Sequence, residues 1–434
     1  MIKDTKGTFN VVDSPMGSGK TSVVIIDEVK KHPEDRHLII TPYLDEVERI
    51  CKATGALQPI GYKRENIKAL ISNGKNICCT HSLFLLLDEE AQALLKRQNY
   101  ILFIDENLSW IEYYTGYRRI INFDQKVIEQ LSMRDLSIMK AEDCVNIDEQ
   151  TKRITWNENS DYKGVYENIK PILANHELFS VGSEAVVGMI KKEFFECFSK
   201  VTICTYRYNN SMLFAYCEIN KIRVELFTVQ NYKIEKYDSS REYYPDALDM
   251  LHVWSNEKHN QIGLKKNAMS KSWYEQTKKD KPKELKILGC NVRAFFRSQK
   301  ANSKEMFWTT FKDYEKAVSP KSYVSGFVSC NMKATNKYRG CCATAYLCNI
   351  FLNPNIITFL SLHNVKINYE QYALSELLQF LWRGAIRDGK EFHVFVPSQR
   401  MRMLLLDWLK AGQKGAEQSP KIKSRCSVEA SGRG

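Results

Sequence analysis

Short apolar runs alternate with amphipathic stretches along the first two hundred residues. The apolar runs cover residues 9–12, 37–41, 76–80, 101–105 and 201–205, and helical patterns lie between them at 22–31, 44–54 and 82–97. Apolar runs that are separated by helices in this way are typical of a parallel sheet flanked by helices. The pattern predicts an α/β domain, and the polar residues that end the runs predict a ligand site at the carboxyl edge of its sheet.

A second alternating series occupies the C-terminal half. Its predicted strands are 306–311, 324–330, 356–360 and 392–396, and its predicted helices are 337–351, 369–388 and 398–411. Residues 213–237 also have the pattern of strands, so the join between the two series falls between about 210 and 286.

These patterns divide the chain into two domains. We place the first domain at 1–210, with the less regular segment 107–200 as an insertion, and a connecting segment with the second domain at 211–412. The lysine-rich run 271–286 is expected to be exposed. Residues 413–434 lack periodicity and predict a disordered tail.

Composition is that of an ordinary globular protein, with 434 residues, of which 44% are hydrophobic and 26% charged. The net charge of +12 favours an anionic partner, and nucleic acid is the commonest one. The 13 cysteines form no C-x-x-C pair and no zinc-like cluster, which favours buried thiols in a reducing compartment. Charges at Lys3, Asp4 and Lys6 and the lack of a membrane-length apolar stretch predict a cytoplasmic protein without membrane contact.

A glycine-rich segment, residues 14–21 (SPMGSGKT), follows the first predicted strand and precedes a predicted helix. This context is that of a phosphate-binding loop, although Ser14 stands where the usual pattern has glycine. Lys20 can reach the β- and γ-phosphates, and the Thr21 hydroxyl can bind Mg²⁺. We therefore expect ATP and Mg²⁺ as cofactors, with the nucleotide held by Gly17, Ser18, Gly19, Lys20, Thr21 and Ser22.

Two adjacent carboxylates end the fourth predicted strand, in the sequence ILFIDE at 101–106. Asp105 is expected to hold Mg²⁺, usually through water, and Glu106 to polarise the attacking water. Because the strand follows the phosphate loop in the same predicted sheet, the two motifs together predict ATP hydrolysis as well as ATP binding.

Residues 379–389 (QFLWRGAIRDG) continue a helical pattern whose apolar face is formed by Leu374, Leu377, Leu378, Leu381 and Ala385. Gln379, Arg383 and Arg387 form a stripe at i, i+4 and i+8 on the opposite side. Such a stripe considered alone is more often a solvated face. Together with a phosphate loop in another domain it predicts catalytic arginine fingers, because a guanidinium group neutralises charge on the γ-phosphate during transfer.

In these segments the chain resembles superfamily 2, DEAD/DEAH-like helicases, of the compact sort found in bacteriophage replication modules. Residues 14–21 resemble motif I of that family, 105–108 motif II and 379–387 motif VI. Weaker likenesses follow in the expected order, with 41–43 for motif Ia, 80–81 for the next strand-end motif, 205–206 for motif III, 309–311 for motif IV and 333–336 for motif V.

The resemblance implies two RecA-like domains with an ATP site in the cleft between them. It implies an ATP-driven helicase or translocase in DNA replication or recombination of a phage or mobile element, in the cytoplasm of a bacterial host. DNA is favoured over RNA, and other replication proteins are possible partners. The nucleic-acid backbone contacts implied by the family are Thr41, Thr80, Thr310, Thr335 and Asn336.

The sequence departs from the family pattern in three places. Arg383 and Arg387 are four positions apart instead of three, which leaves open which of them meets the γ-phosphate. Leu108 replaces the usual fourth residue of motif II, and no Q-motif precedes Ser14, so recognition of adenine is not implied.

Two other functions fit the sequence less well. A DNA-packaging, terminase-like ATPase needs acidic residues at the strand ends of a C-terminal nuclease domain, whereas the predicted strands end beside Thr310, Cys330 and Pro397. A small-molecule kinase is disfavoured by the chain length and by the second alternating series.

Overall fold

The chain folds into two units in a computed structural model that describes residues 7–106, 108–114, 117–121, 125–130, 133–182, 185–300, 302–330 and 336–417. Unit 1 comprises Met1–Tyr243, Ser329–Arg339 and Ile350–Arg383, and unit 2 comprises Tyr244–Val328, Gly340–Asn349 and Gly384–Gly434. Unit 1 thus extends beyond the predicted boundary at residue 210, and it includes two further segments from the C-terminal half.

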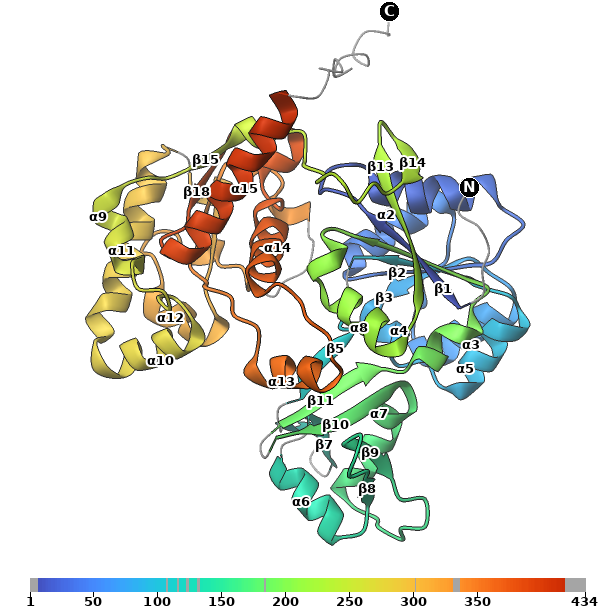
Figure 1. Cartoon of the computed structure of the whole chain (residues 1–434). Coiled ribbons are helices and arrows are strands. Elements are labelled where there is room, and N and C mark those ends of the chain that lie inside the picture. Colours follow the sequence, from blue (N-terminus) through green and yellow to red (C-terminus); the bar gives the residue numbers. More distant parts are fainter. Residues whose placement is uncertain are drawn as a thin grey trace, which may run out of the picture. The chain divides into compact units, whose positions relative to one another are not determined.

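Unit 1 is built on a seven-stranded sheet in the order β14-β13-β1-β12-β4-β2-β3 (Figure 1). Its strands are β1 (Thr8–Asp13), β2 (His37–Thr41), β3 (Ile77–Thr80), β4 (Ile101–Asp105), β12 (Lys200–Thr205), β13 (Arg223–Gln230) and β14 (Lys233–Lys236). Neighbouring strands are parallel, except that the edge strand β14 is antiparallel to β13. The five strands predicted between residues 9 and 205 and their parallel arrangement are confirmed.

Successive side chains of these strands enter two separate cores, one on each face of the sheet. In β4, Leu102 and Ile104 lie in one core and Phe103 lies in the other. The Phe103 core is covered by a π-helical stretch η1 (Thr21–Ile26) that continues into α1 (Asp27–Lys31), and by α2 (Leu44–Thr54). The opposite core is covered by α3 (Lys63–Ser72), α4 (His81–Phe84), α5 (Glu89–Arg97) and α8 (Met212–Asn220). Burial on both faces explains why strands β2, β3 and β4 are mostly apolar.

Two expectations for residues 1–243 of unit 1 are wrong in detail. The helix predicted at 82–97 is broken, because Asp88 caps a new helix by accepting a hydrogen bond from the Ala91 N–H at 3.0 Å. Residues 212–220, predicted as part of a strand segment, form α8. Ser211 caps α8 by accepting from the Phe214 N–H at 3.2 Å, and α8 is largely buried, so its short apolar run has no periodicity that distinguishes helix from strand.

The predicted insertion, residues 107–200, lies between β4 and β12, which are hydrogen-bonded neighbours in the sheet. The insertion has an antiparallel sheet in the order β5-β11-β10-β9-β8 and a separate hairpin. Its elements are β5 (Ile111–Tyr114), β6 (Tyr117–Ile121), β7 (Gln125–Gln130), α6 (Met133–Ala141), β8 (Val145–Ile147), β9 (Arg153–Trp156), α7 (Lys170–Asn175), β10 (His176–Val181) and β11 (Ala185–Ile190).

The C-terminal half adds helices α13 (Pro354–Leu362) and α14 (Tyr369–Leu381) to unit 1. The strand predicted at 356–360 is therefore wrong. Asn353 caps α13, Pro354 occupies its first turn, and the ring of Phe359 lies 5.1 Å from that of Phe179 on β10. An apolar run of five residues does not distinguish strand from helix by itself, and here the cap and the proline decide.

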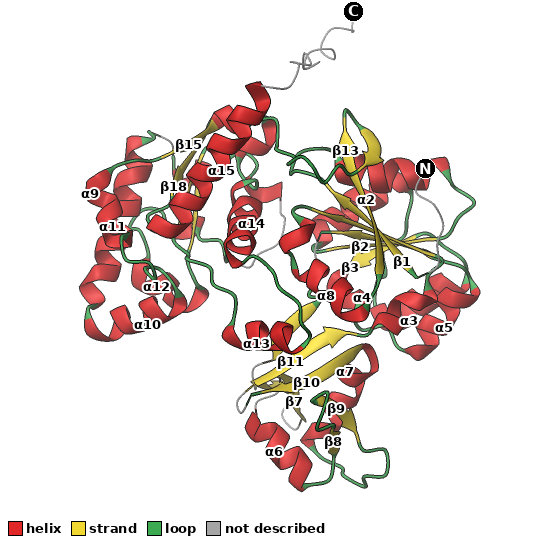
Figure 2. Cartoon of the chain, in the orientation of Figure 1, coloured by secondary structure: helices red, strands yellow, loops and turns green. Residues whose placement is uncertain are grey.

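Unit 2 has a parallel four-stranded sheet in the order β15-β18-β17-β16. Figure 2 shows its helices and strands, which are β15 (Leu251–Val253), α9 (Glu257–Asn260), α10 (Lys271–Asp280), α11 (Pro282–Ser298), β16 (Met306–Thr309), α12 (Glu315–Val318), β17 (Ala343–Tyr346), β18 (Phe392–Phe395) and α15 (Gln399–Glu417). Parallel sheets flanked by helices in both units confirm the predicted α/β fold class.

Two segments of unit 2 differ from expectation. Residues 324–330 hold a short 3-10 turn and one bridge from Phe327 to Trp308 instead of a strand. The helix predicted at 337–351 is wrong, because β17 lies there as a central strand with all four residues buried. The lysine-rich run 271–286 has exposed lysines, as expected; it is mostly helical, and Trp273 and Tyr274 are its buried contacts with the core.

The last described helix extends to Glu417, and residues 418–434 of the predicted tail lie outside the described residues. Among the described helices, none combines the length and apolar character that a bilayer-spanning segment needs. The described cysteines form no disulfide with one another, and most of them are buried, as their spacing predicts.

Candidate nucleotide site

The glycine-rich loop leaves β1 at the carboxyl edge of the sheet and enters η1, so the expected order of strand, turn and helix is present. Gly17 and Gly19 have φ angles of 83° and 82°, in the left-handed region that favours glycine. The Gly19 carbonyl accepts from the Val23 N–H at 2.9 Å, which starts the helix. The loop therefore turns its backbone at the start of a helix, where N–H groups suit an anion.

Ser14 has a structural role that explains its place in the loop. Its N–H donates to the Thr205 carbonyl of β12 at 3.1 Å. Its hydroxyl accepts from the Val229 N–H at 2.6 Å and lies 3.0 Å from the Thr228 hydroxyl, both on β13. The serine that replaces the usual glycine thus joins the loop to the strands on both sides of β1.

Lys20 lies across the loop, and its Nζ donates to the carbonyls of Ser14 at 2.5 Å and Pro15 at 3.0 Å. Removal from water lowers the pKa of the ammonium group below its usual value, while nearby acidic groups, among them Glu106, oppose this. The side chain is thus held over the loop by weak neutral acceptors that phosphate oxygens can replace.

Thr21 and Asp105, which are 84 residues apart in the chain, meet beside the loop. The Thr21 hydroxyl lies 3.2 and 3.1 Å from the two carboxylate oxygens of Asp105 and donates to them. Asp105 is only 6% exposed, and burial, with the charge of Glu106, raises the pKa of its carboxyl to about 7. Hydroxyl and carboxylate oxygens are ligands that Mg²⁺ prefers, so these two residues fit a divalent cation.

Glu106 follows Asp105 where the chain turns away from the sheet. Its φ of 66° is unusual for a residue with a side chain, and its N–H donates to the Cys204 carbonyl of β12 at 3.1 Å. The backbone of Asp105 is held in turn by His81, whose Nε2 lies 3.0 Å from the Asp105 carbonyl oxygen. Asn107, the next residue of motif II, lies outside the described residues.

Sequence reasoning missed Asp13 and Arg207, which connect the ends of β1 and β12. The Asp13 carboxylate accepts from the backbone N–H groups of Arg207 at 2.7 Å and Tyr208 at 2.9 Å. Burial raises the pKa of Asp13, and the two hydrogen bonds oppose that effect. The Arg207 guanidinium pairs with Glu242 at 2.6 Å and donates to Gln371 of α14. The position of Asp13, directly before the loop, was the only available signal in the sequence.

The stripe predicted at 379–387 is not one helical face. Helix α14 ends at Leu381, and Arg387 lies in a separate 3-10 turn, η11 (Ala385–Asp388), that belongs to unit 2. Gln379 donates to the Ser375 hydroxyl at 3.1 Å. Arg383 is buried, with its guanidinium 4.9 Å from the centre of the Phe380 ring. The apolar face of α14 is buried as predicted, but the helix stops before the arginines, so these share no helical axis.

The residues predicted to contact nucleic acid lie in different environments. Thr41, at the end of β2, and Thr310, after β16, are fully buried. The Thr80 hydroxyl caps α4 by accepting from the Leu83 N–H at 3.3 Å. Thr335 lies outside the described residues, and Asn336 begins a short 3-10 turn, η10 (Asn336–Tyr338). Their contacts with nucleic acid stay predictions.

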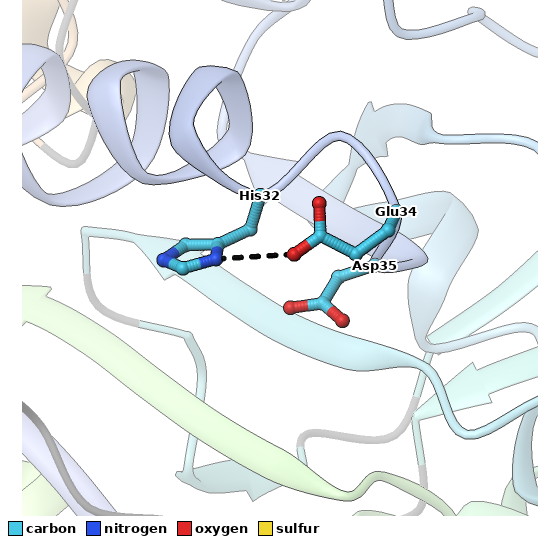
Figure 3. A group of neighbouring side chains, drawn as sticks. All are labelled: His32, Glu34 and Asp35. Atoms are coloured by element: carbon cyan, nitrogen blue, oxygen red, sulfur yellow. Dashed lines mark hydrogen bonds and ion pairs between the residues drawn. The ribbon is translucent and has the colours of Figure 1, made fainter.

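A cluster of His32, Glu34 and Asp35 has the spacing of a metal site within the part of the chain that the structure describes (Figure 3). The His32 Nδ1 lies 3.4 Å from a Glu34 carboxylate oxygen. The cluster follows α1 and precedes β2, at the amino ends of the strands, whereas the phosphate loop lies at their carboxyl ends. It is therefore no part of the candidate nucleotide site.

Fold and loop together define an α/β protein with two parallel-sheet units and a phosphate-loop-like turn in the first. Residues 246–409 match the YonV C-terminal Rossmann-like domain, and residues 126–187 match the YonV middle domain. The SPbeta prophage-derived protein YonV of Bacillus subtilis (strain 168) is 31% identical over 420 residues, covering 92% of this chain and 98% of that protein. The chain belongs to the YonV family.

The two family domains agree with the architecture described above. The C-terminal domain begins two residues after unit 2 does, and the middle domain lies inside the insertion. Among solved structures, that of S. tokodaii Xpd4 aligns with this chain at a TM-score of 0.44 and 10% sequence identity. The alignment covers 92% of this chain and 94% of Xpd4.

Proposed function

We propose that this protein is an ATP-driven nucleic-acid translocase or helicase that acts in DNA replication or recombination of a phage or mobile element. The observation that carries the proposal is the contact between Thr21 and Asp105 beside Lys20. A hydroxyl, a carboxylate and an ammonium group at the start of a helix are the groups that bind a nucleotide triphosphate with its metal. The motif resemblance and the second α/β unit favour a motor over a simple nucleotide-binding protein.

The residues of the loop suggest a division of roles. Lys20 exchanges the carbonyls of Ser14 and Pro15 for β- and γ-phosphate oxygens, and Thr21 with Asp105 holds Mg²⁺. The bound metal supplies charge neutralisation for phosphoryl transfer. Glu106 directs a water molecule at the γ-phosphate. A carboxyl group must lose its proton to bind a metal. Because the pKa of Asp105 is raised to about 7, metal binding becomes easier as the pH rises through neutrality.

Arg207 offers a route by which this site is coupled to the rest of unit 1. It connects the end of β1, through Asp13, with Glu242 and with Gln371 of α14. The chain reaches Arg383 and Arg387 directly after α14, so we assign them the transition-state role that the family resemblance implies. The net charge of +12 and the prophage origin of the YonV relative support DNA as the partner.

The packaging ATPase is the weaker proposal. Strands β16, β17 and β18 of unit 2 end at Thr309, Tyr346 and Phe395. A two-metal nuclease would place carboxylates at such strand ends. These residues support a second motor domain better than a nuclease.

The test measures the ATPase rate against added single-stranded DNA and RNA. Wild type should be stimulated by at least one polymer, and stimulation should weaken steeply with salt. Lys20→Ala should abolish hydrolysis without changing the melting temperature much, because Lys20 belongs to neither hydrophobic core of the sheet and its ammonium group donates to carbonyls of the loop itself. Replacing Thr335 and Asn336 by alanine should reduce stimulation and spare the basal rate. A wild-type rate that neither polymer changes would refute the motor.

A further inference from the structure

Tyr232 occupies an unusual turn next to the phosphate loop. Gln230 of β13 pairs with Lys233 of β14, so Asn231 and Tyr232 form a two-residue hairpin turn, with φ angles of 47° and 57°. Two-residue hairpins of this kind favour asparagine and glycine at both positions, since a side chain is strained there. A bulky tyrosine at positive φ is uncommon and suggests a role for its ring.

The ring of Tyr232 reaches the phosphate loop but remains largely open to solvent. A Cβ atom added to Gly19 would lie 3.2 Å from Cε1 and 3.3 Å from Cδ1 of Tyr232. The tyrosine is nevertheless 76% exposed. The aromatic ring therefore stands at the edge of the loop, and its surface is available to a ligand that the loop holds.

The hairpin is fixed in relation to the loop. Val229 and Thr228 of β13 are hydrogen-bonded to Ser14, and Ile234 of β14 packs against the core that η1 and α1 share. These contacts connect the turn to both ends of the loop, at Ser14 and at Gly19. The sheet therefore fixes the position of the Tyr232 ring relative to the phosphate loop.

Strand order gives the direction in which a nucleotide would lie. Strand β4, which carries Asp105, lies on one side of β1 and is separated from it by β12. The hairpin strands β13 and β14 lie on the other side of β1. Thr21 and Asp105 mark the metal end of the triphosphate, so the base projects away from β4 and toward the hairpin. We propose that Tyr232 stacks on the base of the bound nucleotide and supplies the base contact for which no Q-motif is present.

This inference rests on the proposed nucleotide site but not on nucleic-acid stimulation, so the experiment measures binding alone. Dissociation constants for Mg·ATP and for Mg-bound inorganic tripolyphosphate, which lacks a base, are measured by calorimetry. The proteins are wild type, Tyr232→Ala, Tyr232→Phe and Tyr62→Ala. Tyr62 is a matched control, because it is 90% exposed and precedes α3, which packs on β3 at the opposite edge of the sheet.

Tyr232→Ala should weaken Mg·ATP about tenfold or more, as loss of one base-stacking aromatic does, and leave tripolyphosphate binding unchanged. Tyr232→Phe and Tyr62→Ala should bind ATP like wild type. Tyr232→Trp should show fluorescence quenching by ATP, but not by tripolyphosphate, beyond that of wild type.

The outcomes separate the two proposals. If wild type binds ATP and Tyr232→Ala binds it equally well, stacking is refuted and the nucleotide site stands. If Tyr232→Ala weakens ATP and tripolyphosphate alike, the ring only supports the loop, and stacking is again refuted. If wild type binds neither ligand, both this inference and the proposed function are wrong.

Discussion

Replacing Asp105 by asparagine should stabilise the protein at and above neutral pH while it abolishes metal-dependent ATP hydrolysis. Asp105 is buried beside Glu106, and this environment raises the pKa of its carboxyl to about 7. Asparagine keeps the size of the side chain and can still accept a hydrogen bond from Thr21, but it carries no charge. The change therefore removes the cost of a buried carboxylate together with a metal ligand.

The size of the effect follows from the two pKa values of Asp105. Below pH 4 the carboxyl is mostly protonated in both states, and well above pH 7 it is ionised in both. Between these limits the folded chain holds a proton that the unfolded chain has lost, so stability falls as the pH rises. The difference between the ordinary pKa of 3.8 and the raised pKa of about 7 corresponds to roughly 4 kcal/mol of unfolding free energy, of which somewhat more than half falls between pH 5 and pH 8.

Thermal unfolding at pH 5 and pH 8, without nucleotide or metal, tests this calculation. Between these pH values the melting temperature of wild type should fall by roughly 5 °C more than that of Asp105→Asn. Asp27→Asn, at an exposed position on α1, serves as the control and should follow wild type. Equal pH dependence in wild type and Asp105→Asn would show that the buried carboxyl is not the source of the loss.

The other predictions concern catalysis and the fixing of the loop. Glu106→Gln should retain ATP binding and reduce turnover by about 10²-fold or more, as measured by single-turnover hydrolysis, and wild-type turnover would exclude Glu106 as the residue that activates water. Ser14→Ala should lower unfolding stability by about 1–3 kcal/mol, because the buried Val229 N–H loses its acceptor; an unchanged urea midpoint would contradict this. Arg383→Ala or Arg387→Ala should reduce turnover on the order of 10³-fold with a smaller loss of ATP affinity, and full activity in both variants would exclude arginine fingers.

The α/β class and the five strands predicted between residues 9 and 205 could be predicted because parallel strands that are buried on both faces are mostly apolar. Leu102, Phe103 and Ile104 show this directly, since they face alternate cores of one sheet. The loop at 14–21 was visible for a related reason. The backbone conformation of the loop requires its glycines, and phosphate binding requires its lysine. Both requirements are local, so the residue types reveal them without information on distant contacts.

Short apolar runs were the main source of error. Residues 356–360 form a helix and 343–346 form a central strand, opposite to their predicted types. Strand β17 is buried at all four positions, and the run 356–360 is only five residues long, so neither run is long and alternating enough in the sequence to reveal a period of 2 or of 3.6. The type of each element is decided by the elements against which it packs. Helix α13 packs against the insertion of unit 1, and β17 pairs with β16 on one side and β18 on the other.

The sequence by itself determined the chemistry that is available to the site, because Lys20, Thr21, Asp105 and Glu106 carry it in their side chains. The tertiary structure alone decided which distant residues meet there. Strand pairing brings Thr21 to Asp105 and places Tyr232 beside Gly19, over separations for which local patterns contain no information. Hydrophobic periodicity reports which face of an element is buried, whereas strand order follows from how all the faces pack together.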